Sequence, residues 1–392
     1  MKCNGLDEYP LSYYCIVIGG GTPKTSVPEY WGGNIPWISI KDIVESNNII
    51  ENTEKTITEE GLNNSSTKIL DKGDIIISAR GTVGKIALIS KPMAFNQSCF
   101  GIKVNRNVDP VFFYYVLVNS ISTIKKNTQG SVFDTITAKT FDSIRIAMPT
   151  FEVQRRIGSF LSSIDSQINA NMRINDYLLK LGEAIFDYYQ EDADVSCTIN
   201  DLAEEIVCGK TPSTSYKEYY GEDIPFITIP DLHNSPVIVR TERYLSNIGA
   251  ETQKKKTLPA HSICVSCIAT PGLVSLTSEL SQTNQQINSI ICKKSIPPLY
   301  VYYLMRSSSD VIINLGSSGS ATLNLNKTQF SQIKINILAP IEMLNFNNET
   351  KYILQLIELN SKTNVILESL RDMLLPLLMS GEIDVSKLDL GS

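Results

Sequence analysis

Few side chains in this chain of 392 residues could carry acid–base or metal chemistry, because it contains only two histidines, His233 and His261. His261 lies close to Cys264 and Cys267, and a Cys-x-x-Cys pair is a common arrangement of zinc ligands. The chain has no second pair of this kind, and apolar residues flank both cysteines in a strand-like pattern. We therefore expect buried thiols and no metal ligands, cofactor or catalytic residues in this chain.

A glycine-rich run, YYCIVIGGGTPK, begins at Tyr13 and invites comparison with the dinucleotide-binding pattern GxGxxG. Lys24 stands where the third glycine belongs, and the corresponding segment of the second half, EEIVCGKTPS, lacks the pattern. A phosphate-binding GxxxxGK[ST] loop and a methyltransferase-like Asn-Pro-Pro-aromatic motif are also absent from the sequence. These observations disfavour an enzyme and indicate a protein that recognises another molecule.

An internal repeat accounts for most of the chain. TPKTSVPEYWGGNIPWISIKD, from Thr22, aligns without a gap with TPSTSYKEYYGEDIPFITIPD, from Thr211, and keeps an aromatic at Trp31/Tyr220 and Trp37/Phe226. GDIIISARGTVGKIAL then matches HSICVSCIATPGLVSL, and PVFFYYVL matches PLYVYYLM. The two halves are therefore expected to share one fold.

Each copy has the same predicted order of elements. Two strand-like runs and a tight glycine loop precede a further strand, an aromatic helix, a polar Gly/Ser loop and a last strand. Short strands mixed with helix predict an α+β fold for residues 1–150 and again for residues 191–340. The aromatic stretch Phe112–Tyr115 is expected in the core, since it recurs in a helical pattern at residues 300–303.

Two long helical segments, residues 151–190 and 341–392, follow the two copies. In each segment a column of mostly apolar residues recurs at intervals of three and four, as in a coiled coil. In the first segment these are Ile157, Phe160, Ile164, Gln167, Asn171, Ile174, Leu178, Leu181, Ile185 and Tyr188. In the second they are Ile353, Leu356, Asn360, Thr363, Leu367, Leu370, Leu374 and Leu377. The matching Asn171 and Asn360 favour an antiparallel helix pair in a pseudo-twofold arrangement; two independent amphipathic helices are the alternative.

The charge distribution qualifies the acidic total of −6. Residues 1–150 and 198–340 each carry +1, whereas residues 151–197 and 341–392 each carry −4. A face that binds nucleic acid would thus be a local patch and would need a basic partner. The N-terminus lacks a signal-peptide pattern, and no apolar run approaches the roughly 18 residues of a membrane-spanning helix. We expect a cytoplasmic protein with no membrane partner.

Two variable units, each followed by a similar long helix, resemble the specificity subunits of type I restriction–modification enzymes. GGGTPKTSVPEYWGGNIPWISIKDI and KGDIIISARGTVGKIAL resemble parts of their target-recognition domains. PTFEVQRRI, from Pro149, and LESLRDMLLPLLMSGEI, from Leu367, resemble parts of their spacer helices. The second helix begins PIEMLNFNNE and lacks the Glu-x-Gln pattern of the first, and the second glycine loop has lost Arg80, Gly81 and Lys85.

The resemblance implies a double-stranded DNA partner with a bipartite site, one half for each domain, and helices that set the gap between the halves. It also implies two methyltransferase subunits and, in the full complex, restriction and translocase subunits. S-adenosylmethionine, ATP and magnesium would belong to those partners.

Candidate DNA-binding residues are polar side chains in loops, where donors and acceptors can reach a major groove. In the first domain they are Thr22, Lys24, Lys41, Arg80, Thr82, Lys85, Asn96, Gln97, Gln129 and Ser131. In the second they are Lys210, Thr211, His233, Thr270, Asn284, Gln285, Ser318 and Ser320. Each could instead be an ordinary turn residue. For the whole chain the alternatives are a specificity protein of a related restriction system and a scaffold that binds proteins.

Overall fold

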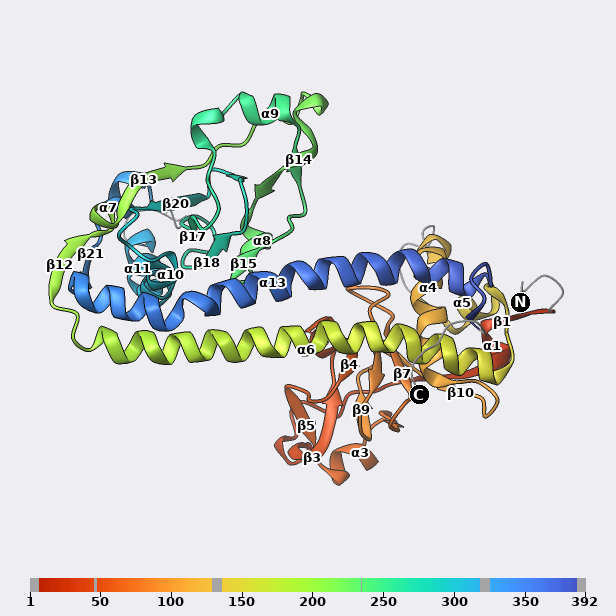
Figure 1. Cartoon of the computed structure of the whole chain (residues 1–392). Helices are drawn as coiled ribbons and strands as arrows, with labels where there is room; N and C mark the ends of the chain where they lie inside the picture. Colours follow the sequence, from red (N-terminus) through yellow and green to blue (C-terminus); the bar gives the residue numbers. More distant parts are fainter. Residues whose placement is uncertain (1–6, 46–47, 129–135, 234, 318–324, 386–392) are drawn as a thin grey trace. The chain divides into compact units, whose positions relative to one another are not determined.

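The computed structural model describes residues 7–45, 48–128, 136–233, 235–317 and 325–385 (Figure 1). It divides into two compact units: unit 1 comprises residues 1–169 and 367–392, and unit 2 comprises residues 170–366. Each unit combines one α+β domain with a part of each long helix. Within the described ranges, no helix is long and apolar enough to cross a membrane.

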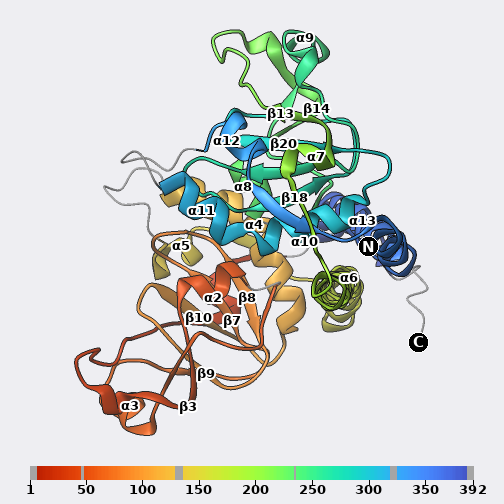
Figure 2. The ribbon, with the colours of Figure 1, turned by 90° about the vertical axis from the view of Figure 1, so that its left-hand side faces the viewer.

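The domain of unit 1 is built on a five-stranded sheet with the order β2-β10-β7-β8-β4. These strands are β2 (Cys15–Gly19), β10 (Cys99–Val104), β7 (Ile75–Ser78), β8 (Ile86–Ile89) and β4 (Ile49–Ile50). A second sheet, of order β5-β3-β9-β6, forms the outer part of the domain (Figures 1 and 2). Its strands are β5 (Lys55–Ile57), β3 (Trp31–Ile38), β9 (Met93–Phe95) and β6 (Ile69–Leu70). β1 (Glu8–Pro10) pairs with β11 (Arg145–Ala147).

The main sheet of unit 1 is covered by the aromatic helix α4 (Pro110–Thr128). Phe113 and Leu117 are fully buried there and Phe112, Tyr114 and Tyr115 nearly so, which confirms that this stretch belongs to the core. The remaining helices of the domain are short: α1 (Leu11–Tyr14), η1 (Pro28–Tyr30), α2 (Ile40–Glu45), α3 (Glu59–Asn63) and α5 (Ala138–Asp142).

The domain of unit 2 has the same order of strands, β13-β20-β17-β18-β15, as the repeat predicted. These are β13 (Ala203–Cys208), β20 (Ile287–Cys292), β17 (Ile263–Ser266), β18 (Val274–Thr277) and β15 (Val237–Ile238). Its outer sheet contains β16 (Tyr244–Leu245), β14 (Tyr220–Ile227) and β19 (Gln282–Thr283). A single bridge between Leu258 and Ser281 occupies the place of β6. β12 (Val195–Thr198) pairs with β21 (Lys334–Ile337).

Helix α10 (Pro298–Ser307) of unit 2 packs on β17 and β18, as α4 does in unit 1 (Figure 2). Its Tyr300, Tyr302 and Tyr303 are buried, so the second aromatic stretch is also core. The other helices are α7 (Ile199–Leu202), η2 (Lys217–Tyr219), α8 (Ile229–His233), α9 (Asn247–Glu251), η3 (Lys254–Lys256), α11 (Ser309–Ser317) and α12 (Lys327–Ser331).

The long helices are α6 (Phe151–Gln190) and α13 (Pro340–Met379), and the parts of them in unit 2 are antiparallel. The Asn171 Nδ2 atom donates to Asn364 Oδ1 at 2.8 Å, and Asn360 Nδ2 donates to Asn175 Oδ1 at 2.8 Å. The predicted antiparallel pairing is therefore confirmed in this unit. The repeat-related Asn171 and Asn360 do not pair with each other; each pairs with an asparagine one helical turn away from the other.

One of the two columns of predicted coiled-coil positions is wrong. Ile174, Leu181 and Tyr188 of α6 are 47%, 53% and 74% exposed, and Leu356 and Leu370 of α13 are also exposed. The buried columns contain instead Leu161, Ile168, Asn175, Gly182, Ile357, Asn364 and Leu378. Apolar periodicity favoured the column with Ile174 and Leu181, because Asn175 and Gly182 of the buried column are not apolar. In the fold the Asn175 amide is bonded to Asn360 and Ser361, which makes its burial possible.

The contact between helices and domain differs between the units at one repeated tyrosine. In unit 1, the Tyr115 hydroxyl donates to Asp165 Oδ2 at 2.6 Å, and Arg371 pairs with Asp165 at 2.7 Å. In unit 2, the equivalent Tyr303 donates to the Leu179 carbonyl at 2.9 Å. A Cβ atom on Gly182, the counterpart of Arg371, would lie 2.4 Å from the Tyr303 hydroxyl, so any larger residue there would force the Tyr303 side chain to move.

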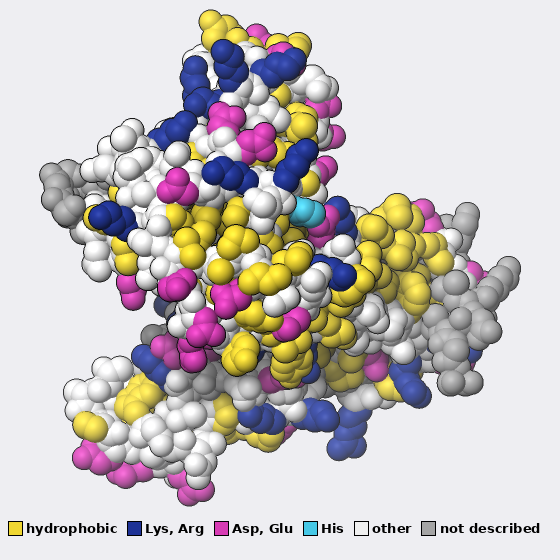
Figure 3. Space-filling model, turned by 60° about the vertical axis from the view of Figure 1, so that its left-hand side comes forward, with side chains coloured by type: hydrophobic (Ala, Val, Ile, Leu, Met, Phe, Trp, Pro, Cys, Tyr) yellow, Lys and Arg dark blue, Asp and Glu magenta, His cyan; other side chains and the backbone are white. Residues whose placement is uncertain are grey.

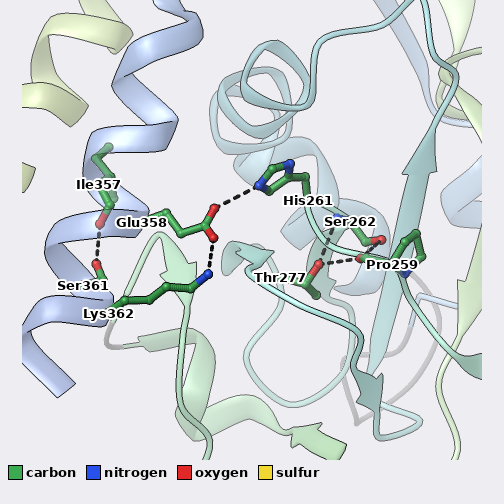
Figure 4. A network of polar contacts seen from close by, with 8 residues as sticks. All are labelled: Pro259, His261, Ser262, Thr277, Ile357, Glu358, Ser361 and Lys362. Atoms are coloured by element: carbon green, nitrogen blue, oxygen red, sulfur yellow. Dashed lines mark hydrogen bonds and ion pairs between the residues drawn. The ribbon is translucent and has the colours of Figure 1, made fainter. Parts of the chain in front are cut away.

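Unit 2 also has a polar link between its domain and α13 (Figure 4). His261 Nε2 lies 3.0 Å from Glu358 Oε2, and Lys362 pairs with the other oxygen of the same carboxylate. His261 has the left-handed φ of 63°, and the equivalent residue of unit 1 is Gly73, with φ 88°. Burial alone would raise the pKa of Glu358, but hydrogen bonds from Lys362 and His261 outweigh it and lower the pKa.

Candidate nucleic-acid interface

Three loops of unit 1 meet at one end of its main sheet. The Gly21 N–H donates to the Phe95 carbonyl at 3.0 Å, and the Ala79 N–H donates to the Ser98 carbonyl at 2.8 Å. The Thr22 hydroxyl donates to the side-chain oxygen of Gln97. Residues 20–27, 79–85 and 96–98 therefore form one continuous surface, which we call the first recognition edge.

The β7–β8 hairpin within this edge is fixed by one buried serine. Ser78 Oγ accepts from the Lys85 N–H at 2.8 Å and donates to the Thr82 carbonyl, and the Gly84 N–H donates to the Ser78 carbonyl at 2.9 Å. Gly81 and Gly84 have φ angles of 70° and 82°, which glycine adopts without steric cost. The loop is thus rigid at its base and carries exposed side chains at its tip.

Unit 2 has the same surface at residues 209–216, 267–273 and 284–286, the second recognition edge. Lys210 N–H donates to the Thr283 carbonyl at 3.0 Å, and Thr211 Oγ1 donates to Gln285 Oε1 at 2.6 Å. Ser266 Oγ accepts from the Leu273 N–H at 2.8 Å and donates to the Thr270 carbonyl, so it repeats the role of Ser78.

Most candidate residues of the first domain lie on the first recognition edge. Lys24, Arg80, Thr82, Lys85 and Gln97 are exposed, and Thr22 and Asn96 are half-buried. Lys41 lies on α2 and pairs with Glu54 at 2.9 Å. The side chain of its neighbour Ile40 approaches Gly81. Gln129 and Ser131 lie outside the described residues.

The second recognition edge collects five of the candidate residues of the second domain. Lys210, Thr270 and Gln285 are exposed, Thr211 is half-buried and Asn284 is buried. His233 is exposed at the end of α8, outside the three loops of this edge. Ser318 and Ser320 lie outside the described residues.

Two candidate asparagines shape turns. Asn96 Oδ1 accepts from the Ser98 N–H, and Asn284 Oδ1 accepts from the Gln286 N–H, both at 3.0 Å. Asparagine side chains commonly close such turns by accepting from the backbone two residues on. In the described structure these two residues therefore support Gln97 and Gln285, which project beside them.

Aromatic residues outside the set of predicted polar side chains hold the loops in place. Trp31 Nε1 donates to the Lys24 carbonyl at 3.2 Å, and Trp37 Nε1 donates to the Gly21 carbonyl at 3.1 Å. In unit 2 the Tyr220 hydroxyl donates to the Pro212 carbonyl at 2.7 Å. The signal that could have found them was the aromatic kept at Trp31/Tyr220 across the repeat.

The Cys-x-x-Cys pair of unit 2 belongs to the core, as the strand pattern predicted. Burial raises the pKa of both Cys264 and Cys267 to about 12, so they are thiols at neutral pH. Cys264 Sγ accepts a hydrogen bond from the Ser289 hydroxyl at 3.6 Å. A protonated, buried thiol is a poor metal ligand and a poor nucleophile.

Comparisons with known proteins agree with this architecture. Residues 9–179 and 194–340 each match the family described as type I restriction modification DNA specificity domain. The chain is 31% identical to the specificity subunit of the type I restriction enzyme HindI of Haemophilus influenzae, over 89% of this chain and 94% of that one. It is 26% identical to the MjaIX specificity subunit of Methanocaldococcus jannaschii, over 95% and 92% of the two chains.

A solved structure supports the same fold. The S subunit of a type I restriction–modification system from M. genitalium aligns with a TM-score of 0.60 at 13% identity, over 96% of this chain and 97% of that one. The two family matches together span most of the sequence, and the HindI relative has nearly the same extent. These findings identify the fold and its repeat. The chain belongs to the family of type I restriction–modification DNA specificity subunits.

Proposed function

We propose that each recognition edge contacts one half of a bipartite double-stranded DNA site. The observation that carries this proposal is the repeated edge, in which three loops have the same backbone hydrogen bonds in both units but different side chains at their tips. A constant backbone with variable exposed donors suits two surfaces that recognise different base sequences.

The side chains of the first recognition edge suit contacts with both bases and phosphates of DNA. The planar guanidinium of Arg80 suits a bidentate contact with guanine or a phosphate, whereas Lys24 and Lys85 suit phosphate. The Thr22 hydroxyl orients the Gln97 carboxamide, a group that can pair with adenine. In the second edge Lys210 supplies a cation, and Gln285, oriented by Thr211, supplies the carboxamide.

We assign the chemistry to partner subunits and recognition alone to this chain. S-adenosylmethionine, ATP and magnesium would be held by two methyltransferase subunits and by restriction and translocase subunits. Exposed apolar side chains on the helical part of unit 2 support a docking role (Figure 3). Tyr177, Leu181, Leu359 and Ile366 are 70%, 53%, 60% and 66% exposed there. Exposed apolar patches of this kind commonly mark protein interfaces.

The test is to co-express the chain with a methyltransferase subunit and map the methylated sites on genomic DNA. The expected result is one bipartite site with an unspecified gap. Substitutions at Arg80 and Gln97 should then alter only one half, and substitutions at Lys210 and Gln285 only the other. Methylation at a continuous site, or stable association with a methyltransferase without any sequence-dependent methylation, would contradict the proposal and favour a scaffold.

The gap between the two half-sites would be set by α6 and α13. The asparagine pairs show which residues face each other, so a clean shortening removes facing heptads, residues 171–177 with 358–364. This deletion removes all four asparagines and shortens each helix by about 10 Å, close to three base pairs. It should shorten the gap and leave both half-site sequences unchanged. Deleting residues 171–177 alone should prevent assembly. An unchanged gap in the assembled double deletion would show that the length of the helices does not set the gap.

A further inference from the structure

We propose that Trp31 and Tyr220 are positioning residues for DNA specificity, each acting on the loop that opens one recognition edge. This inference rests on the proposed function, because it specifies how each edge holds its donors. Neither residue needs to touch DNA; each fixes the backbone from which recognition side chains project.

The first loop, residues 20–27, has little regular structure of its own. Its Val27 N–H donates to the Lys24 carbonyl at 3.2 Å, which closes a turn, and the Trp31 indole N–H donates to the same carbonyl. Trp31 begins β3, so the indole ties the turn that carries Lys24 to the outer sheet. Without the indole, the turn would lose its side-chain link to that sheet at Lys24.

The second loop, residues 209–216, has the same construction with different chemistry. Its Tyr216 N–H donates to the Ser213 carbonyl at 3.3 Å, which repeats the turn at the equivalent position. Tyr220 begins β14 and donates its hydroxyl to the Pro212 carbonyl, one residue before the repeat position that Trp31 contacts. Two different donors, an indole and a phenol, thus reach the same part of the loop.

A cation covers the aromatic ring in both units and limits its movement. The Lys55 ammonium lies 5.9 Å from the Trp31 ring centroid, and the Arg243 guanidinium lies 4.7 Å from that of Tyr220. Each cation comes from, or immediately precedes, the strand that pairs with the strand of the aromatic residue. Such contacts stabilise a ring in a defined position, so the donor of each aromatic residue is held against its loop.

The two loops differ in how many anchors they have. In unit 1 the buried Trp37 indole donates to the Gly21 carbonyl, whereas the side chain of the equivalent Phe226 has no hydrogen-bond donor. The second loop therefore depends more strongly on its single aromatic donor. Loss of the Tyr220 hydroxyl should have the larger consequence, although it removes only one atom.

The experiment compares Trp31→Phe and Tyr220→Phe in the full chain assembled with its methyltransferase. Both substitutions keep a ring beneath the cation and remove the donor; Tyr220→Phe removes only the hydroxyl, whereas Trp31→Phe also replaces the indole with a smaller ring. The measurement is the rate of methylation of the mapped site and of duplexes with one mismatch in either half. Trp31→Phe should lower discrimination by roughly two- to fivefold in one half-site, and Tyr220→Phe by roughly five- to tenfold in the other, as expected for a lost hydrogen bond.

Exchange of the two aromatic donors provides the rescue. Trp31→Tyr and Tyr220→Trp restore a donor, and each should discriminate better than the phenylalanine variant at the same position. Tyr219→Phe is the matched control, because the Tyr219 hydroxyl has no hydrogen-bond partner in the described part of the chain. It should discriminate as the parent protein does.

Two outcomes would overturn the inference. In the first, the phenylalanine variants discriminate as the parent does. In the second, both half-sites and the thermal midpoint change together, which indicates a general loss of structure. Failure of the proposed function is distinguishable, since the parent assembly would then show no bipartite site at all.

Discussion

The hairpins at residues 79–85 and 267–273 have the same backbone and different chemistry. Ser78 and Ser266 make equivalent hydrogen bonds, and the left-handed Gly81 and Gly84 correspond to Ala269 and Gly272, with φ angles of 65° and 92°. Arg80 and Lys85 of the first hairpin are replaced by Ile268 and Leu273 in the second. The backbone of each hairpin is thus held by the buried serine and by residues with left-handed φ, while the exposed side chains at the tip differ.

A second contrast lies where the domain of each unit meets the helices. Unit 1 uses a charged cluster, Tyr115–Asp165–Arg371, and unit 2 uses close contact of Tyr303 with Gly182. Burial raises the pKa of Tyr115, and the neighbouring Asp165 carboxylate adds to this effect, so the phenol remains a donor. The hydroxyls of the two equivalent tyrosines therefore have different acceptors: an ion-paired carboxylate in unit 1 and a backbone carbonyl in unit 2.

The largest effect is expected from Asp165→Leu, which places in unit 1 the residue type of its counterpart, Leu354. It removes the acceptor of Tyr115 and leaves Arg371 without its buried partner, since Asp165 is only 6% exposed. The free energy of unfolding should fall by about 3 kcal/mol. Thermal and denaturant unfolding of the chain measures the loss. Asp165→Leu with Arg371→Leu should recover much of it, and a single variant as stable as the parent would show that the ion pair is dispensable.

A smaller effect is expected when the first hairpin receives the side chains of the second, in Arg80→Ile/Lys85→Leu. Removal of two phosphate-competent cations should weaken DNA binding by the assembled complex about ten- to a hundredfold at physiological salt. The slope of log affinity against log salt should become shallower by about 1.8. Fluorescence anisotropy over a salt series measures both. The reciprocal variant Ile268→Arg/Leu273→Lys should steepen the slope. Unchanged slopes in both double variants would show that the hairpins do not contact DNA.

The smallest effect is expected at the His261–Glu358 link, which unit 1 lacks. His261→Gly relieves a left-handed backbone but removes one partner of Glu358, so the net change should stay within about 1 kcal/mol. The contribution of the Glu358 carboxylate is measured by comparing the free energy of unfolding of the parent and of Glu358→Gln at several pH values. Because the folded pKa of Glu358 is lowered, its contribution is present above the ordinary value of 4.5 and is lost as the pH falls through the folded pKa. The variant and parent should converge below that pH; a constant difference would contradict this assignment.

The sequence alone determined the repeat, the shared fold of its two copies, the aromatic core and the family. These features are local or periodic: strand runs, glycine loops and helical spacing are written in neighbouring residues, and a duplicated pattern reinforces each of them. The sequence also predicted loops that the fold brings together at the recognition edges, because the polar residues it selected lie where strands end.

Only the tertiary structure decided which face of each long helix is buried. Apolar periodicity favoured an exposed column on α6, because the buried column contains Asn175 and Gly182, whose partners are distant in the chain. It also separated Asn96 and Asn284, which close turns, from the glutamines beside them. The support of Lys24 by Trp31 and of Pro212 by Tyr220 was equally hidden, because a side-chain donor and a backbone carbonyl meet only when a loop folds back onto its strand.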